Sequence, residues 1–450
     1  MSTTDVAGAA ARPGYRYYVL AVLILIYVLN FLDRQIIGIL GPRLIEEFKL
    51  TDTQFGLLGG LAFASVYSTL AIPLAWLADR VSRVWIMTGA LAVWSGFTAL
   101  CGTAGSFGQL FLYRMGVGVG EAGGVAPAYS LIADYFPKTQ RARALAAYAF
   151  GIPIGTAAGT LVGGVLAAQY GWRTAFVVVG ILGVLVAPLL RLTVKDPKRG
   201  GLDAPAVEAA APVVEAAPAK APPFGAVCGT VFRKRSFWLL AFGAASSSVC
   251  GYGVAGWLPS FFIRSFDLTL IQTSWYYAGI ALVGGLAGIW GGGMVADRMG
   301  RASKGAYPLV PAIAFLISAP CFILAMNSPW LIGLVLPGGG TNAQQLIVAF
   351  LIFLIPTGLN LTWLGPITAS IQHLVPPPMR TTASALFLLI NNLQGIAVGC
   401  YYFGWMSDLL APRFGEESLR WAIYTGMGFY LLASVLLIGA SRTLRKDWVE

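Results

Sequence analysis

The chain has 450 residues, of which 57% are hydrophobic and 11% are charged, and its mean hydropathy is +0.73. About a quarter of the residues in a soluble domain are charged, so this composition argues against a soluble enzyme and predicts an all-α polytopic membrane protein. The net charge of +11 does not indicate nucleic acid as a partner, because the basic residues gather in short connections between apolar runs.

Apolar runs of ~20 residues, long enough to span a bilayer, form two sets of six after a polar N-terminus at residues 1–16. The sets predict twelve transmembrane helices in two six-helix bundles, at residues 17–194 and 236–442, followed by a short tail at 443–450. The individual runs fall near 17–40, 54–77, 84–105, 107–134, 142–168, 172–194, 236–263, 272–296, 306–328, 344–372, 381–406 and 420–442.

Residues 195–235 separate the two sets and are rich in proline and alanine. Such a composition predicts a flexible, partly extended linker without chemical machinery of its own. The prolines that carry this prediction are Pro205, Pro212, Pro218, Pro222 and Pro223.

The basic residues also predict the orientation. With the N-terminus inside, 22 of the 30 Lys and Arg residues are cytoplasmic, six are outside, and Arg34 and Arg114 lie within helices. Since Lys and Arg in short loops favour the cytoplasmic side, we predict that both termini and the linker are cytoplasmic. The protein is therefore expected in the cell membrane, which is the inner membrane in a Gram-negative bacterium.

Two charged clusters occupy the same relative place in the two halves. The sequence ADRVSR at residues 78–83 follows the second apolar run, and ADRMGR at 296–301 follows the eighth. An Asp-Arg-x-x-Arg sequence suits a short turn at the membrane edge, where the carboxylate faces the end of a neighbouring helix. Two copies in equivalent places predict two parallel six-helix repeats.

Four charges lie well inside the predicted helices: Asp33, Arg34, Arg114 and Glu121. A charge at the bilayer centre costs ~3 kcal/mol on insertion scales, so these side chains need partners, a wet cavity, or both. Arg114 and Glu121 are two helical turns apart and share a face. Helix 1 runs outward and helix 4 inward at about 1.5 Å per residue, which brings Asp33 and Arg114 to similar depth and predicts a contact between them.

Two interpretations of this cluster remain open. It is either a static network that holds the first bundle together, or a group that couples protons to transport and orients the substrate. In the second interpretation Asp33 and Glu121 are the titrating groups, because a carboxylate at low dielectric can take up a proton whereas an arginine cannot lose one.

Other side chains in the apolar runs carry weaker signals. Asn391 and Asn392 lie midway along the eleventh run, where they either line a cavity or form an interhelical hydrogen bond. His373, the only histidine, is expected to pack at the cytoplasmic end of helix 10. Four aromatic residues are expected to anchor helix ends at the membrane interface: Trp257, Trp275, Tyr276 and Tyr277.

Several segments together resemble the major facilitator superfamily over nearly the whole chain and, within it, the Spinster-like family, especially its bacterial members. The matching segments are NFLDR at 30–34, LTDTQFGLL at 50–58, RMGVGVGEA at 114–122, GWRTAF at 171–176, LVPPPMR at 374–380 and NNL at 391–393. The chain departs from the superfamily pattern in four places: Ala75 and Ser82 stand where glycines are usual, Val84 where a basic residue is common, and Gly399-Cys400 where Gly-Pro is usual.

The resemblance implies a secondary transporter that works by alternating access and moves an amphipathic lipid-like substrate, such as a lysophospholipid or a sphingosine-phosphate-like molecule, together with protons. A proton-coupled symporter of small organic anions is the alternative, because anion-symporter families share the Asp-Arg and Gly-Glu-Ala patterns. We expect no enzyme activity, no cofactor and no metal, since the chain has no Walker-type loop and one histidine, and we expect a monomer. The expected roles are proton coupling for Asp33 and Glu121; substrate binding for Arg34, Arg114, Asn391 and Asn392; and gating for Asp79, Arg80, Arg83, Asp297, Arg298 and Arg301.

Overall fold

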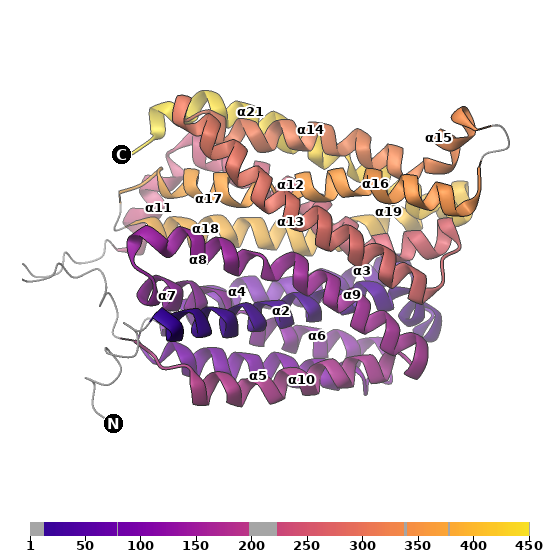
Figure 1. The fold of residues 1–450 in the computed structure, drawn as a ribbon, viewed down its shortest axis with the longest axis horizontal. Helices are drawn as coiled ribbons and strands as arrows, with labels where there is room; N and C mark the ends of the chain where they lie inside the picture. Colours follow the sequence, from indigo (N-terminus) through magenta and orange to yellow (C-terminus); the bar gives the residue numbers. More distant parts are fainter. Residues whose placement is uncertain (1–12, 79, 198–222, 337–339, 377–378, 450) are drawn as a thin grey trace, which may run out of the picture.

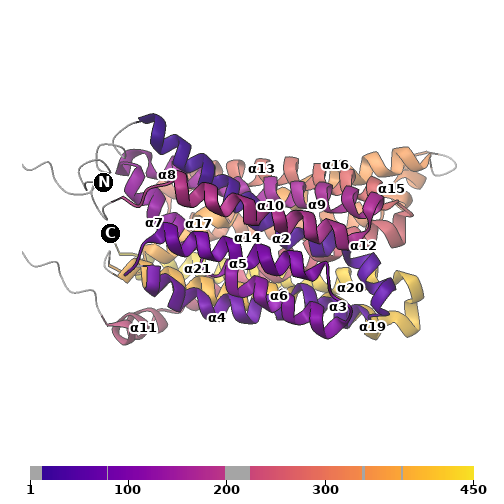
Figure 2. The ribbon, with the colours of Figure 1, turned by 90° about the horizontal axis from the view of Figure 1, so that it is seen from below.

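The structure, a computed structural model, describes residues 13–78, 80–197, 223–336, 340–376 and 379–449. Throughout these ranges the regular secondary structure is helical. Figures 1 and 2 show most helices as long rods that lie side by side, with the start of α2 and the end of α21 at the same end. The charge distribution predicts that this end is cytoplasmic, so we name it the inner end and the opposite one the outer end.

The first bundle is built from six rods, three of which are interrupted by a short break. Its helices are α2 (Pro13–Phe48), α3 (Asp52–Gly59), α4 (Leu61–Ala78), α5 (Arg83–Cys101), α6 (Phe107–Glu121), α7 (Val125–Tyr135), α8 (Lys138–Ala149), α9 (Gly151–Tyr170) and α10 (Trp172–Thr193). Each break lies at or beside a glycine: Gly60 separates α3 from α4, residues 122–124 separate α6 from α7, and Gly151 begins α9 after α8.

The second bundle repeats this organisation after a short helix, α11 (Phe224–Phe232), at the inner end. Its helices are α12 (Arg235–Phe266), α13 (Leu270–Ala302), α14 (Ala306–Met326), α15 (Ser328–Val335), α16 (Asn342–Asn360), α17 (Leu364–Gln372), α18 (Arg380–Asn392), α19 (Gly399–Phe414), α20 (Ser418–Gly426) and α21 (Gly428–Asp447). A π-helical turn at Leu393–Val398 joins α18 to α19.

Ten segments of the described chain are long and apolar enough to cross a membrane. Two more rods are present beyond these ten. The turn at residues 122–124 divides the α6–α7 rod, and the segment Thr382–Asp447 reverses direction at Gly415–Glu417 and therefore contains two rods. The arrangement is consistent with the twelve transmembrane helices that the sequence predicts.

The two bundles meet along α9 and α13 and along α2 and α12. Glycines permit the close approach of α9 and α13: a Cβ atom at Gly164 would lie 1.7 Å from the Ser274 hydroxyl, and one at Gly285 would lie 2.6 Å from the Pro153 ring. Small residues at helix contacts are the usual solution in membranes, where close backbone packing replaces the hydrophobic driving force.

The last part of the predicted linker is helical. The structure describes α11 as a helix within the predicted linker, and its Val227 and Val231 are buried. The reason is local composition: the prolines of the linker end at Pro223, and FGAVCGTVF follows without one, so nothing interrupts the backbone hydrogen bonds. Most of the proline-rich stretch, including Pro205, lies outside the described residues.

The second charged cluster, at residues 296–301, does not form the turn that its sequence predicts. α13 continues through Asp297 and Arg298 to Ala302, and the chain turns only at residues 303–305. The first cluster does form the predicted turn, because α4 ends at Ala78 and the Ser82 side chain caps the start of α5. The Ser82 hydroxyl accepts a hydrogen bond from the Trp85 backbone N–H, as an N-cap side chain does at the start of a helix. The corresponding position in the second cluster is Gly300, which lies within α13.

Candidate functional site

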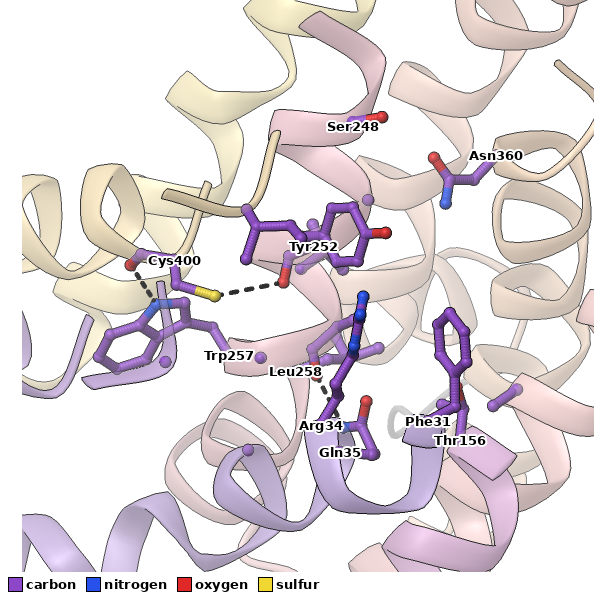
Figure 3. Close-up of a pocket in the computed structure, with 18 of the residues that line it drawn as sticks. Phe31, Arg34, Gln35, Thr156, Ser248, Tyr252, Trp257, Leu258, Asn360 and Cys400 are labelled. Atoms are coloured by element: carbon purple, nitrogen blue, oxygen red, sulfur yellow. Dashed lines mark hydrogen bonds between the residues drawn. The ribbon is translucent and has the colours of Figure 1, made fainter. Parts of the chain in front are cut away.

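A central cavity lies between the two bundles and takes its walls from both (Figure 3). Its polar lining in the first bundle includes Arg34, Gln35 and Arg114, and its wall in the second bundle is mainly aromatic and aliphatic. The aromatic and polar residues on the second bundle's side are Ser248, Tyr252, Trp257, Tyr277, Phe322, Thr357, Asn360, Trp363, Cys400 and Tyr430.

The four intramembrane charges form two ion pairs beside this cavity. Arg114 Nη1 lies 3.8 Å from Asp33 Oδ1, as the depth argument predicts. Arg34 Nε donates to Glu121 Oε2 at 2.7 Å. This second pair joins α2 to α6, and the sequence analysis did not predict it.

The packing around Glu121 explains how α6 reaches this position. A Cβ atom at Gly120 would lie 2.4 Å from the Trp94 backbone nitrogen, and one at Gly118 would lie 2.6 Å from the Phe63 carbonyl oxygen. These glycines let α6 pack directly against α4 and α5. The side chain of Glu121 is completely buried as a result, and α6 ends there.

Both arginines keep hydrogen-bonding capacity that the described residues do not use. Arg34 Nη2 and Arg114 Nε and Nη1 are buried and have no hydrogen-bond partner there. The Arg34 guanidinium also lies 4.7 Å from the Tyr67 ring centre and 4.9 Å from the Phe63 ring centre, which holds the cation on aromatic faces. Unused donors on a buried cation that faces a cavity favour an anionic ligand.

Asp33 has one further partner, because the Thr98 hydroxyl donates to its Oδ2 atom. Its Oδ1 atom and the Oε1 atom of Glu121 are buried without a hydrogen-bond donor in the described chain. Glu121 Oε1 therefore has no donor among these residues, and Asp33 Oδ1 faces only the Arg114 Nη1 atom, 3.8 Å away, so that neither oxygen is blocked by a hydrogen bond from taking up a proton.

Two of the predicted interfacial anchors are wrong. Trp257 is fully buried, lines the cavity and donates its indole N–H to the Cys400 carbonyl oxygen at 2.9 Å (Figure 3). Tyr277 also lines the cavity and is buried. Trp275, by contrast, is 63% exposed, as an anchor residue should be. Trp275 and Tyr277 lie two positions apart on α13 and therefore point in different directions, which hydropathy alone does not resolve.

Asn391 and Asn392 are not among the residues that line the cavity. Asn391 is buried and accepts a hydrogen bond from the Ser248 hydroxyl at 2.9 Å, which is the interhelical alternative. Asn392 separates Asn391 from the π-helical turn, where a Cβ atom at Gly395 would lie 2.5 Å from the Ser248 Cβ atom. The Asn391 amide therefore contacts a cavity-lining residue, Ser248, without lining the cavity itself.

The predicted gating residues lie at the inner end. Arg83 is fully buried, contacts Asp134, and donates to Ser130 Oγ at 2.8 Å and to Asp196 Oδ1 at 2.9 Å. It therefore ties the first turn to α7 and to the segment after α10, all within the first bundle. Arg80 is exposed over the Trp76 ring.

The remaining gating candidates are less defined. Asp297 and Arg298 are exposed on the last turns of α13. Asp79 and the side chain of Arg301 lie outside the described residues. His373 stacks on Trp448 with ring centres 4.2 Å apart, in agreement with a packing role.

The outer ends of the bundles are tied by a polar cluster that the sequence analysis did not identify. Asp52 on α3 forms a two-bond ion pair with Arg264 on α12, at 2.7 and 2.8 Å. Asp408 on α19 accepts the backbone N–H groups of Asp52 and Thr53, at 3.1 and 2.8 Å. We name Asp52, Thr53, Arg264 and Asp408 the outer tie.

Sequence reasoning also missed Asn360 and Tyr252, which contribute polar atoms to the cavity from the second bundle. A polar side chain midway along an apolar run could have identified Asn360. The same pattern was used for Asn391 but not for Asn360. No group of three or more His, Cys, Asp or Glu side chains in the described ranges is placed to hold a metal ion.

Two six-helix bundles around a central cavity with buried charges define a membrane transporter. A family model described as Major Facilitator Superfamily matches residues 23–399. The chain is 30% identical over 461 residues to protein spinster homolog 1 of Homo sapiens, a match that covers 96% of this chain and 82% of that protein. The chain therefore belongs to the Major Facilitator Superfamily and is a transporter of the Spinster type.

Further relatives agree with this assignment. An MFS-type efflux pump of Mycolicibacterium smegmatis is 31% identical over 444 residues, which are 97% of this chain and 95% of that protein. A crystal structure of a bacterial homologue of the human lysosomal transporter Spinster, in an inward-facing and unoccupied conformation, matches with a TM-score of 0.81 and 29% identity, covering 98% of this chain and all of that one. The occupied inward-facing conformation matches with a TM-score of 0.78 and 30% identity.

Proposed function

We propose that this transporter moves an amphipathic, lipid-like anion, such as a lysophospholipid or a sphingosine-phosphate-like molecule, together with protons. The observation that carries the proposal is the unequal polarity of the cavity. One wall presents Arg34 and Arg114 with unused N–H groups. The facing wall is dominated by aromatic and aliphatic side chains, which suit a hydrocarbon tail.

Charge balance supports coupling to protons. Asp33, Arg34, Arg114 and Glu121 sum to zero when all are ionised. A bound monoanion leaves one negative charge uncompensated in an apolar setting, which is costly. Uptake of one proton by Asp33 or Glu121 restores neutrality and releases its arginine for the ligand. Proton and anion therefore favour each other's binding, and such coupling is reciprocal.

Proposed roles for the remaining predicted residues follow from their positions. We propose that Asn391 acts on substrate through Ser248, a cavity residue that donates to its amide, and that Asn392 supports it. For Asp79, Arg80 and Arg83 we propose a gating role at the inner end, with Arg83 positioning the turn. Asp297, Arg298 and Arg301 are proposed as the weaker counterpart in the second bundle.

A ligand series tests the substrate class. The purified chain is challenged with alkyl phosphates of increasing tail length and with short dicarboxylates and monocarboxylates, and thermal unfolding is followed. Ligands that bind the folded state raise its apparent stability. We expect the shift to grow with tail length, because each buried methylene contributes about 0.8 kcal/mol. Stabilisation by short organic acids alone would contradict the lipid-like substrate class and favour the organic-anion symporter.

A further inference from the structure

The second bundle's wall of the cavity is mostly apolar, and Asn360 contributes a polar amide to it. It is the last residue of α16, at the break before α17, and it lines the cavity from the second bundle. Figure 3 shows its amide and the Arg34 guanidinium reaching into the same space from different bundles.

Tyr430 on α21 fixes the orientation of this amide. The Tyr430 hydroxyl donates to Asn360 Oδ1 at 3.0 Å. Tyr430 is completely buried and stacks on Phe315 and Phe322, with ring centres 5.5 and 6.1 Å away. A buried phenol hydroxyl needs an acceptor, and the Asn360 amide oxygen is the one that the described residues supply.

The orientation leaves the Asn360 Nδ2 group as a donor toward the cavity. Among the described residues, the hydrogen bond recorded for the Asn360 side chain is the one that its Oδ1 atom accepts. α12 makes room for the amide with a glycine, because a Cβ atom at Gly251 would lie 2.9 Å from Nδ2 and 3.0 Å from Oδ1. The second bundle thus holds one oriented, unused N–H donor group in the cavity.

We propose that Asn360 Nδ2 donates to an uncharged oxygen of the substrate, a hydroxyl or ester oxygen next to the anionic group, while Arg34 and Arg114 bind the anion. This inference rests on the proposed function and adds a requirement to it. The substrate class is an anion that carries a second acceptor oxygen. A ligand held in this way contacts both bundles, so that its binding acts directly on the contact between them.

Two probes with equal tails test the proposal in the full-length chain: dodecyl phosphate and 1-lauroyl-glycerol 3-phosphate. Only the second offers glycerol and ester oxygens. We expect the wild-type chain to bind it about fivefold to tenfold more tightly, the effect of one hydrogen bond that is otherwise unmade. Asn360→Leu should abolish this preference, so that the variant binds the two probes with equal affinity.

Two further variants complete the experiment. Tyr430→Phe keeps the ring and removes the hydroxyl that orients the amide, so it should reduce the preference without removing the amide. Asn327→Leu is the matched control, because Asn327 donates to the Tyr424 hydroxyl at 2.6 Å and does not line the cavity. It should keep the wild-type preference.

The outcomes distinguish a failure of the Asn360 role from a failure of the proposed function. Equal binding of both probes by the wild-type chain, or a preference that survives in Asn360→Leu, would overturn the role of Asn360 and leave the proposed function standing. Binding of neither probe by the wild-type chain would overturn the proposed function and this inference together.

Discussion

Removal of the Asp408 carboxylate should open the outer end of the molecule. Asp408 accepts the N–H groups of the first two residues of α3, Asp52 and Thr53, and also the Thr53 hydroxyl at 2.5 Å. A carboxylate at a helix N-terminus is well placed for both hydrogen bonding and the helix dipole. Here the helix and the carboxylate belong to different bundles, so the contacts last only while the outer ends are together.

The size of the effect follows from these contacts. A hydrogen bond to a charged group contributes about 1.5–3 kcal/mol, and bonds in one cluster do not add up. If Asp408→Ala loses the free energy of one such bond, the equilibrium constant between the conformations should shift about 10- to 100-fold toward outward-open ones. The ion pair of Asp52 with Arg264 remains, so we expect a shift rather than a collapse of the fold.

Labelling of a cavity cysteine from outside measures the shift. Ser248→Cys, in a chain whose five native cysteines are replaced, reports access to the cavity for a membrane-impermeant maleimide. The labelling rate should rise at least severalfold in Asp408→Ala. Glu46→Gln is the control, because its carboxylate contacts Arg43 on the same helix. Equal rates in the parent, the control and Asp408→Ala would refute the idea that the outer tie holds the bundles together.

Three further predictions concern other parts of the chain. Asp79→Asn should change the accessibility of inner-end cysteine probes and the transport rate while membrane insertion stays normal, and unchanged values for both would remove its gating role. Deletion of part of residues 203–222 should preserve transport, since the segment has no apolar side chain larger than valine and is broken by prolines, whereas inactivity at normal membrane levels would show a function for the linker. Arg114→Ala should weaken anion binding by tenfold or more, because it removes a fixed buried cation, and an unchanged dissociation constant would contradict its role in binding.

The sequence predicts the transmembrane rods well because hydropathy reports the environment of a whole helix. The Asp33–Arg114 contact could be predicted in the same way, since depth along two helices follows from residue counts. The Arg34–Glu121 pair was missed because it depends on the rotation of α2 and α6 about their axes. That rotation is set by packing, such as the approach of Gly120 to Trp94, which hydropathy does not report.

The cavity wall of the second bundle shows the same limit. Trp257 and Tyr277 fit an interfacial anchor by residue type, yet both are buried beside the cavity. Aromatic residues serve either purpose, and their position along the rod does not decide between them. The outer tie was missed for another reason: Asp52 and Asp408 lie far apart in the chain, and only the assembled bundles bring them together.

The central claim is that the buried carboxylates couple protons to the movement of an amphipathic anion. The most direct measurement is accumulation of a radiolabelled lysophospholipid in proteoliposomes under an imposed pH gradient, for the wild-type chain, Glu121→Gln, Asp33→Asn and the surface control Glu46→Gln. The account predicts uphill accumulation by the wild type and the control, and its loss in both buried variants while some downhill exchange or ligand binding survives. Full gradient-driven accumulation by both Glu121→Gln and Asp33→Asn would contradict the account and leave the four charges as a static network.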